Sequence, residues 1–401
     1  MTDSPAASPS LDAGATYRRD RSTWLFYATL CYYAYLISCL GPAMPFLRDE
    51  LGFPLGVASW HFGAAAAGGV CVGLFGEPVI RLLGRERAHW LGAAGLVIAT
   101  LLLTLGRQPV VTVAGALLSG LLGGLVLVSG QAALADHHGA RRAIALTESN
   151  VLASGASILA AVAVGVFGGS AIGWRGAYWL TIPAILAIAW RFGSAWPAGE
   201  AAPRQRPGGR VALPQVFWLF VGVLVCGTAV EWCVSYWGAG FLAGAHGLSP
   251  SSAAIGMSVF FVGMLVGRAV GTVLARTTSP ARLLPGALGL ALVGFPLLWL
   301  APTAPLALLG LGLTGLGIAN VYPMAISAAA GLVPENADLA LTRVAIGSSG
   351  SILLAPLVLG ILADRFGIAG AFGIGVPLLA VGLSVALAAS RRTTRPVAPG
   401  T

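Results

Sequence analysis

The sequence predicts an all-α membrane protein with twelve transmembrane helices, arranged as two pseudo-symmetric six-helix bundles. Hydrophobic residues make up 57% of the 401 positions and charged residues only 9%, whereas soluble domains carry about 25% charged residues. Apolar runs of about 20 residues, long enough to cross a bilayer as a helix, recur along the chain. They lack the alternation of apolar and polar residues that membrane β-strands show, so the spans are predicted to be helical.

Twelve spans are predicted, six in each half of the chain. The first six are residues 23–46, 56–78, 88–106, 109–135, 143–168 and 173–193. The second six are residues 214–241, 250–274, 283–301, 305–330, 340–363 and 367–390. The chain therefore divides into a tail (1–22), an N-terminal bundle (23–193), a linker (194–213), a C-terminal bundle (214–390) and a second tail (391–401). The linker is rich in Pro, Gly and Arg, a composition typical of flexible connections.

The two halves repeat each other at an offset of 195 positions. At this offset, Ala-Leu-Thr-Glu at 145–148 falls on Ala-Leu-Thr-Arg at 340–343. Seven pairs of glycines also coincide: Gly52/Gly247, Gly68/Gly263, Gly76/Gly271, Gly115/Gly310, Gly120/Gly315, Gly155/Gly350 and Gly165/Gly360. Two similar halves of the same orientation are the pattern of membrane transporters built from parallel repeats.

The positive charge of the chain indicates its orientation in the membrane. The net charge is +9, and all 23 basic residues are arginine. With a cytoplasmic N-terminus, 17 arginines lie on the cytoplasmic side, four on the outer side and two within spans. This is the positive-inside bias. It predicts a multi-pass protein of the cytoplasmic (inner) membrane with both termini in the cytoplasm, and it gives no indication of nucleic-acid binding.

The sequence also argues against an enzyme. The loops between the predicted spans leave no room for a soluble catalytic domain, and the chain has no lysine for a nucleotide-binding loop. All five cysteines lie within predicted spans, without the spacing of a zinc site. We therefore expect no enzyme activity, no cofactor and no metal. The expected partners are a small-molecule substrate, protons and the lipid bilayer, with a monomer as the functional unit.

Three short motifs accompany the duplicated plan. Gly-Trp-Arg-Gly at 173–176 leads into the sixth span, Gly267-Arg268 with Gly271 lies in the eighth, and Gly-Ile-Leu-Ala-Asp-Arg-Phe-Gly at 360–367 closes the eleventh. These features make residues 20–392 similar to the major facilitator superfamily. The resemblance implies a secondary transporter whose spans one, four, seven and ten line a central path. It also implies that span five packs against span eight, and span two against span eleven.

Glu231 in the seventh span is the predicted proton-coupling residue. An ionisable group inside a bilayer costs at least about 2.5–3.5 kcal/mol unless it faces a cavity or a partner. The four path-lining spans contain no basic residue, and a carboxyl group in a low dielectric without a nearby cation binds a proton more readily. The alternative is a permanently protonated, structural glutamic acid that is hydrogen-bonded between helices.

Glu148, Arg268 and Arg343 are predicted to form a gate between the bundles. We expect Glu148 and Arg268 to form an ion pair across the seam of spans five and eight that holds the cytoplasmic side shut. Arg343 occupies the position equivalent to Glu148 in the second half. It is expected either to play the reciprocal part near span two or to neutralise a helix end. Because these residues lie near helix ends, solvated side chains are the alternative.

The predicted substrate path is lined by aromatic and small polar side chains: Tyr32, Tyr35, Ser38, Gln131, Trp232, Ser235, Tyr236, Asn320 and Tyr322. Tyr and Trp combine a broad apolar body with one polar tip, which suits an amphipathic organic ligand. Packing or a place at the membrane interface is the alternative for each. An arginine would be expected in the path of an anionic substrate, and these spans offer none.

This pattern favours proton-coupled export of a drug-like compound or metabolite by alternating access. Uptake of a sugar or another small nutrient with protons is the alternative. A membrane receptor that binds a ligand without transporting it is a more remote alternative.

Overall fold

The computed structural model describes residues 17–197, 213–333 and 337–394, and these residues form helices and connecting turns without strands. The first half of the chain forms α1 (Arg21–Leu51), α2 (Leu55–Leu83), α3 (Arg85–Leu105), α4 (Pro109–His138), the 3-10 helix η1 (Gly139–Arg141), α5 (Arg142–Gly168), α6 (Arg175–Trp179) and α7 (Thr181–Phe192). The second half forms α8 (Gln215–His246), α9 (Pro250–Leu274), α10 (Pro280–Trp299), α11 (Ala304–Ile318), α12 (Val321–Gly331), α13 (Ala337–Phe372) and α14 (Gly375–Thr394).

These helices are consistent with the twelve predicted crossings. Ten segments of the described chain are long and apolar enough to span a membrane, and one of them, Pro109–Gly168, contains both α4 and α5. The sixth predicted crossing is α6 followed by α7, each too short to span alone. Most of the predicted tails and linker, residues 1–16, 198–212 and 395–401, lies outside the described residues.

The helix is broken at two later places, once within the tenth crossing and once between the eleventh and twelfth. The tenth is divided into α11 and α12, and Pro323, which lacks an N–H group, follows the break. Within α13, Gly367 has a φ of 72°, a backbone conformation that glycine adopts readily. The last residues of α13 therefore begin the twelfth crossing, where the predicted span 367–390 starts.

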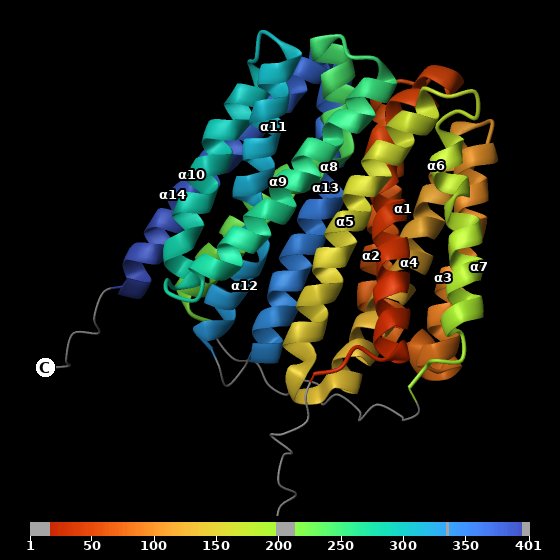
Figure 1. Ribbon diagram of the computed structural model, residues 1–401. Helices are drawn as coiled ribbons and strands as arrows, with labels where there is room; N and C mark the ends of the chain where they lie inside the picture. Colours follow the sequence, from red (N-terminus) through yellow and green to blue (C-terminus); the bar gives the residue numbers. More distant parts are fainter. Residues whose placement is uncertain (1–16, 198–212, 334–336, 395–401) are drawn as a thin grey trace, which may run out of the picture.

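The helices form two bundles that stand side by side (Figure 1). The two ends of the described chain lie on one side of the molecule, here called the termini side, and the opposite side is called the distal side. Between the bundles, α5 packs against α9, α2 against α13 and α1 against α8. The implied contacts of span five with span eight and of span two with span eleven are confirmed.

The bundles approach most closely toward the distal side. A Cβ atom added to Gly41 of α1 would overlap the backbone of Ser235 in α8. A Cβ atom on Gly165 of α5 would lie 2.6 Å from the carbonyl oxygen of Ser251 in α9. Glycine at these positions allows the backbones to meet closely where the lipid provides no hydrophobic drive for helix association.

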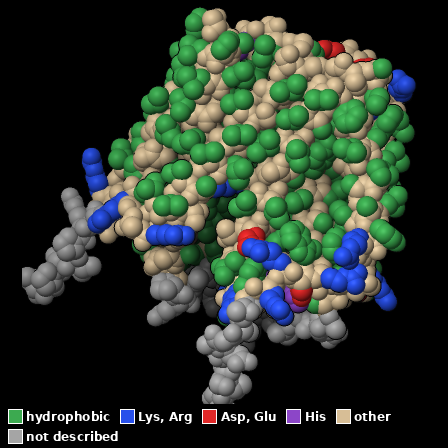
Figure 2. Space-filling view, in the orientation of Figure 1, with side chains coloured by type: hydrophobic (Ala, Val, Ile, Leu, Met, Phe, Trp, Pro, Cys, Tyr) green, Lys and Arg blue, Asp and Glu red, His purple; other side chains and the backbone are tan. Residues whose placement is uncertain are grey.

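Contacts between the bundles are distributed unevenly along the helices. The described parts of the two bundles are joined by close glycine contacts, ring contacts and hydrogen bonds. These contacts extend from Arg268 of α9 to the distal ends of the helices. Figure 2 shows the surface hollowed between the bundles toward the termini side, with a basic side chain visible inside. This conformation is therefore closed on the distal side and open on the termini side.

Candidate functional site

Glu231 lies beside an arginine at the junction of the bundles. Arg268 of α9 places its Nη2 atom 4.0 Å from Oε1 of Glu231 in α8. Its Nη1 atom donates a hydrogen bond of 2.8 Å to Oγ of Ser154 in α5, a helix of the other bundle. The expectation that Glu231 has no nearby cation is therefore wrong. The cation comes from α9, which is not one of the four path-lining spans, and the long arginine side chain reaches across to α8.

The carboxyl group of Glu231 retains unused hydrogen-bonding capacity. It accepts no hydrogen bond from the described residues, and 18% of its side chain is exposed. Thr228, one turn earlier on α8, has a buried hydroxyl group without a partner among those residues. Tyr322 lies on α12, which packs against α8. Because buried polar groups normally find partners, the free acceptor atoms of Glu231 and the hydroxyl group of Thr228 are available to further partners.

Glu148 is bound within its own bundle and does not pair with Arg268. Its Oε1 atom accepts a hydrogen bond of 2.6 Å from Nη2 of Arg19, and its Oε2 atom accepts one of 2.8 Å from Nε of the same arginine. The hydroxyl groups of Tyr27 and Tyr17 donate to Oε2 at 2.9 and 3.2 Å. The two hydroxyl groups also lie 2.8 Å from each other, and together with Arg19 they hold the carboxylate within its own bundle.

The helix geometry explains why the expected Glu148–Arg268 pair is wrong for this conformation. Arg268 contacts α5 at Ser154, which lies about 9 Å further along the axis than Glu148 and about 240° around it, at 1.5 Å and 100° per residue. Arg343 is exposed on α13 and forms no ion pair with the described residues. It contacts neither Glu148 nor the Glu231–Arg268 pair through any hydrogen bond or ion pair among them. A gate role for these three residues in another conformation stays a prediction.

The hydroxyl groups predicted in the path on α1 are used inside the N-terminal bundle. Tyr32 donates to a backbone carbonyl of α3 and Tyr35 to one of α6, at 3.4 and 3.0 Å. Ser38 donates to Oγ of Ser157 in α5 at 2.9 Å. These bonds agree with the packing alternative for the three residues, and their contact with substrate stays a prediction.

The other predicted path residues divide between the Glu231 region and the closed side. Tyr322 is 39% exposed. Asn320 donates to the carbonyl of Gly267, directly before Arg268. Gln131, Trp232 and Ser235 are half-buried in α4 and α8, and the ring of Trp232 contacts that of Tyr236. The path residues that come closest to Glu231 therefore belong to the C-terminal bundle.

Three buried aromatic side chains close the distal side. Phe62 of α2 stacks on Tyr236 of α8 with 4.5 Å between ring centroids, and its edge contact with Trp237 has 5.0 Å between centroids. The indole N–H of Trp237 donates to the carbonyl of Pro356 in α13 at 3.0 Å. We call Phe62, Tyr236 and Trp237 the aromatic plug. Phe62 and Trp237 were not predicted as site residues, because an aromatic residue in an apolar span carries no signal of its partners.

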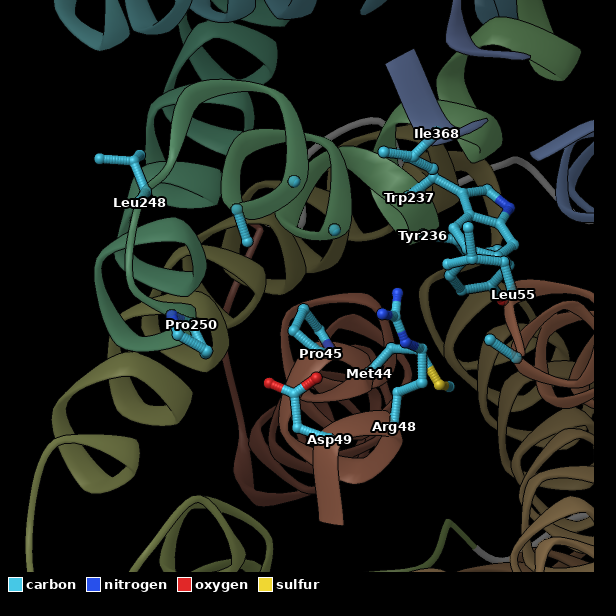
Figure 3. A pocket seen from close by; sticks show the side chains of 14 residues that line it. Met44, Pro45, Arg48, Asp49, Leu55, Tyr236, Trp237, Leu248, Pro250 and Ile368 are labelled. Atoms are coloured by element: carbon cyan, nitrogen blue, oxygen red, sulfur yellow. The ribbon is translucent and has the colours of Figure 1, made fainter. Parts of the chain in front are cut away.

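A pocket of about 410 Å³ lies on the distal side of the plug. Figure 3 shows Arg48 and Asp49 of α1 on one side of its opening and Tyr236 and Trp237 on another. Glu231 precedes Tyr236 by about one and a half turns on α8, toward the termini side. The plug therefore separates the distal pocket from the Glu231 cluster. Among the described residues, no group of three or more His, Cys, Asp or Glu side chains is placed to hold a metal ion.

Two helical bundles that are closed on one side and open on the other, with a charged pair of one bundle hydrogen-bonded to a helix of the other, have the architecture of an α-helical membrane transporter. The chain belongs to the major facilitator superfamily, whose family model matches residues 25–320 and 220–401. It is therefore a multi-pass membrane protein of a family whose members carry small-molecule substrates as monomers, and not an enzyme.

Two curated relatives are similar in sequence, and neither is characterised. An MFS-type transporter of Yersinia pestis is 30% identical over 179 residues, which cover 45% of this chain and 44% of the relative. A transporter of Sinorhizobium fredii is 32% identical over 160 residues, which cover 38% of this chain and 41% of the relative. The chain thus spans less than half the length of both relatives.

Solved structures share the fold over nearly the whole chain. A bacterial homologue of the human lysosomal transporter Spinster, in its inward-facing occupied conformation, has a TM-score of 0.74 at 16% identity and covers 94% of this chain and 98% of its own. A D-xylose-proton symporter has a TM-score of 0.70 at 13% identity, with coverages of 92% and 96%. The nucleoside transporter NupG has a TM-score of 0.67 at 14% identity, with coverages of 94% and 99%. At these identities the likeness shows the fold alone.

Proposed function

We propose that the protein is a proton-coupled secondary transporter that exports a small amphipathic compound, drug-like or a metabolite, in exchange for protons. Glu231 is the proton carrier. The observation that supports this role is its place between the bundles, with unused hydrogen-bonding capacity and an arginine at 4.0 Å. Charged groups inside membrane spans commonly mark proton and substrate pathways.

The Glu231–Arg268 pair offers a physical link between protonation and the seam of the bundles. Arg268 is attracted by the ionised Glu231 of α8 and is hydrogen-bonded to Ser154 of α5. Protonation of Glu231 removes the attraction on one side and leaves the bond to the other bundle. A proton therefore changes the balance of forces at the helix interface that must open and close during alternating access.

The membrane orientation follows from the arginine distribution. With both termini in the cytoplasm of a cell whose inner membrane holds the protein, the hollow opens to the cytoplasm and the aromatic plug faces outward. A compound from the cytoplasm then reaches the Glu231 cluster in this conformation. The aromatic side chains near Glu231 support an amphipathic substrate, and export is the direction that we propose for it.

Uptake by proton symport is the second candidate function. Arg268 near Glu231 favours it, because an arginine freed by protonation of its partner binds an acidic group. The direction of proton movement on substrate binding separates the two candidates. Release of a proton indicates exchange, and uptake of a proton indicates symport.

The test uses the full chain in proteoliposomes with a trapped pH indicator and a panel of amphipathic amines, aromatic amino acids, organic acids and sugars. A substrate gradient should move protons through the wild type. Glu231→Gln should lose the proton movement that accompanies substrate movement. Unchanged proton movement in Glu231→Gln would overturn the assignment of Glu231. Arg276→Gln, an exposed arginine beyond the end of α9, is the matched control.

A further inference from the structure

The distance between Glu231 and Arg268 leaves both groups able to bind something else. At 4.0 Å, the two atoms attract each other but lie beyond hydrogen-bonding distance. Arg268 uses one of its N–H groups on Ser154, and a guanidinium has five donors in a fork that matches a carboxylate. Glu231 accepts no hydrogen bond from the residues that the structure describes. Arg268 therefore has free N–H donors, and Glu231, beside it, has free acceptor oxygens.

The sign of the two charges selects among ligands. An organic cation at Glu231 is repelled by Arg268, and an organic anion at Arg268 is repelled by ionised Glu231. A ligand that carries both charges on neighbouring atoms meets attraction from both residues. Among the described residues, Arg268 of α9 is the one basic side chain that lies within ion-pair distance of Glu231.

The surroundings leave the charge pair accessible and offer an aromatic face. The side chain of Arg268 is 38% exposed and Tyr322 is 39% exposed, so the pair is not sealed. Tyr322 lies on α12, which packs against α8. An aromatic face near a charge pair suits a ligand with an apolar side chain and a small charged head.

We propose that the Glu231–Arg268 pair binds a zwitterionic substrate with an ammonium group on Glu231, a carboxylate on Arg268 and an apolar body toward Tyr322. This assignment rests on the proposed function and names its substrate class. It also replaces the sequence argument that an acidic group is disfavoured, because α9 supplies the arginine that the path-lining spans lack.

Binding of a zwitterion also specifies how protons are coupled. The ammonium group and the proton compete for the same carboxylate, so substrate binding releases the proton from Glu231, as exchange requires. A simple carboxylic acid instead binds Arg268 only when Glu231 is protonated, and its binding takes up a proton. The charge of the substrate therefore determines whether its binding at this site releases or takes up a proton.

The experiment compares ligands that differ only in charge. The phenyl set is L-phenylalanine, 3-phenylpropionate and 2-phenylethylamine, and the indole set is L-tryptophan, 3-indolepropionate and tryptamine. Binding to the purified full chain is measured by titration calorimetry in weak buffer with a pH indicator. In at least one set, the zwitterion should bind at least about tenfold more tightly than the acid and the amine. It should release up to about one proton per ligand below the pH at which Glu231 ionises.

Variants assign each charge to its residue. Arg268→Gln should abolish the preference for the zwitterion over the amine. Glu231→Gln should abolish both its preference over the acid and the release of protons. Arg276→Gln, the exposed control, should change neither. An acid or amine that binds most tightly in both sets, binding by neither zwitterion, or an unchanged preference in Arg268→Gln would overturn the proposal.

The two proposals fail in different ways. If an acid binds best and Glu231→Gln abolishes its proton uptake, the zwitterion site is wrong while Glu231 remains the proton carrier. If a zwitterion binds best through Arg268 but its proton release persists in Glu231→Gln, the substrate class stands and the proposed carrier is wrong.

Discussion

Glu148 and Glu231 are acids within predicted apolar spans, one in each bundle, but the side chains around them differ sharply. Glu148 accepts four hydrogen bonds from Arg19, Tyr17 and Tyr27. Glu231 accepts none from the described chain and has an arginine at 4.0 Å. The bonds to Glu148 raise the pKa of Arg19 further above its usual range, because they stabilise the charged guanidinium. A saturated carboxylate is a fixed structural anion, whereas an unsaturated one is free to exchange partners.

The comparison shows that the location of a charge within a span is a poor guide to its role. Both acids were singled out because they lie inside apolar segments. Their surroundings differ in the basic residues that reach them from other parts of the chain. Arg19 precedes α1, more than a hundred residues before Glu148, while Arg268 reaches Glu231 from the next helix, α9.

The largest difference is expected between Glu231→Gln and Glu148→Gln. Glu231→Gln should reduce proton-coupled transport at least about tenfold, because the proposed proton carrier is gone. Its free energy of unfolding should change by less than about 1 kcal/mol, since the remaining Arg268 is 38% exposed and keeps its hydrogen bond to Ser154. Glu148→Gln should leave the coupling ratio unchanged and lower the free energy of unfolding by about 2 kcal/mol, the cost of weakening hydrogen bonds to a charged group.

Transport in proteoliposomes and thermal unfolding in detergent measure the two effects separately. The proposed division between a stabilising Glu148 and a proton-coupling Glu231 would be contradicted if Glu148→Gln uncoupled transport from protons. It would also be contradicted if Glu231→Gln were the less stable of the two proteins. Glu148→Asp, which keeps the charge on a shorter side chain, controls for position.

The next effect concerns the pairing of Glu231 with Arg268. Arg268→Gln leaves the carboxylate without its cation, and we expect a loss of about 1–2 kcal/mol of stability after allowance for the partial exposure of both side chains. The double variant Glu231→Gln/Arg268→Gln should recover most of that loss, because no unpaired charge remains. A double-mutant cycle from thermal unfolding gives the coupling energy. Additive effects would show that the two groups do not interact.

A smaller effect tests the saturation of Glu148. Tyr27→Phe removes one hydrogen bond to the carboxylate from a side chain that is 2% exposed, which should cost about 1.5 kcal/mol. Tyr17→Phe removes the longer bond of 3.2 Å from a more exposed side chain and should cost less. Equal losses in thermal unfolding experiments would contradict the ranking by burial and bond length.

The fold could be predicted closely from the sequence, because the length of the apolar runs and their repetition in the two halves determine the number and order of the helices. Twelve spans could be recognised from apolar runs, and the packing of α5 on α9 and of α2 on α13 followed from the resemblance to a family. The break at Leu180 between α6 and α7 was not predicted, although Pro183, which lacks an N–H group, follows it by three residues.

The site was predicted less completely. Glu231 and Arg268 were each recognised as unusual charges, but their partners depend on how far a long side chain reaches between helices. Arginine from α9 reaches α8 and α5 together, which a list of path-lining spans cannot reveal. The Phe62–Tyr236 stack likewise depends on contact between bundles that lie far apart in the sequence.

The smallest effect lies at the segment that delivers Arg19 to Glu148. Asp20 caps α1 by accepting the backbone N–H of Thr23 at 2.9 Å, and its other oxygen lies 2.7 Å from Nε2 of His137 at the end of α4. Burial alone would raise the pKa of Asp20, but the bonds from Thr23 and the interaction with His137 hold it below its usual value. Asp20→Ala should therefore lower the free energy of unfolding by about 1 kcal/mol at neutral pH.

The pH dependence of this loss follows from the sign of the shift. A lowered pKa in the folded protein stabilises it above the pKa of the unfolded chain, about 3.9, and that stabilisation disappears as pH falls through the folded value. Thermal unfolding of wild type and Asp20→Ala should thus differ at pH 7 and converge below about pH 4. Asp20→Asn keeps the cap without the charge and should lose less. A difference that persists undiminished in acid would assign the contribution of Asp20 to packing instead of ionisation.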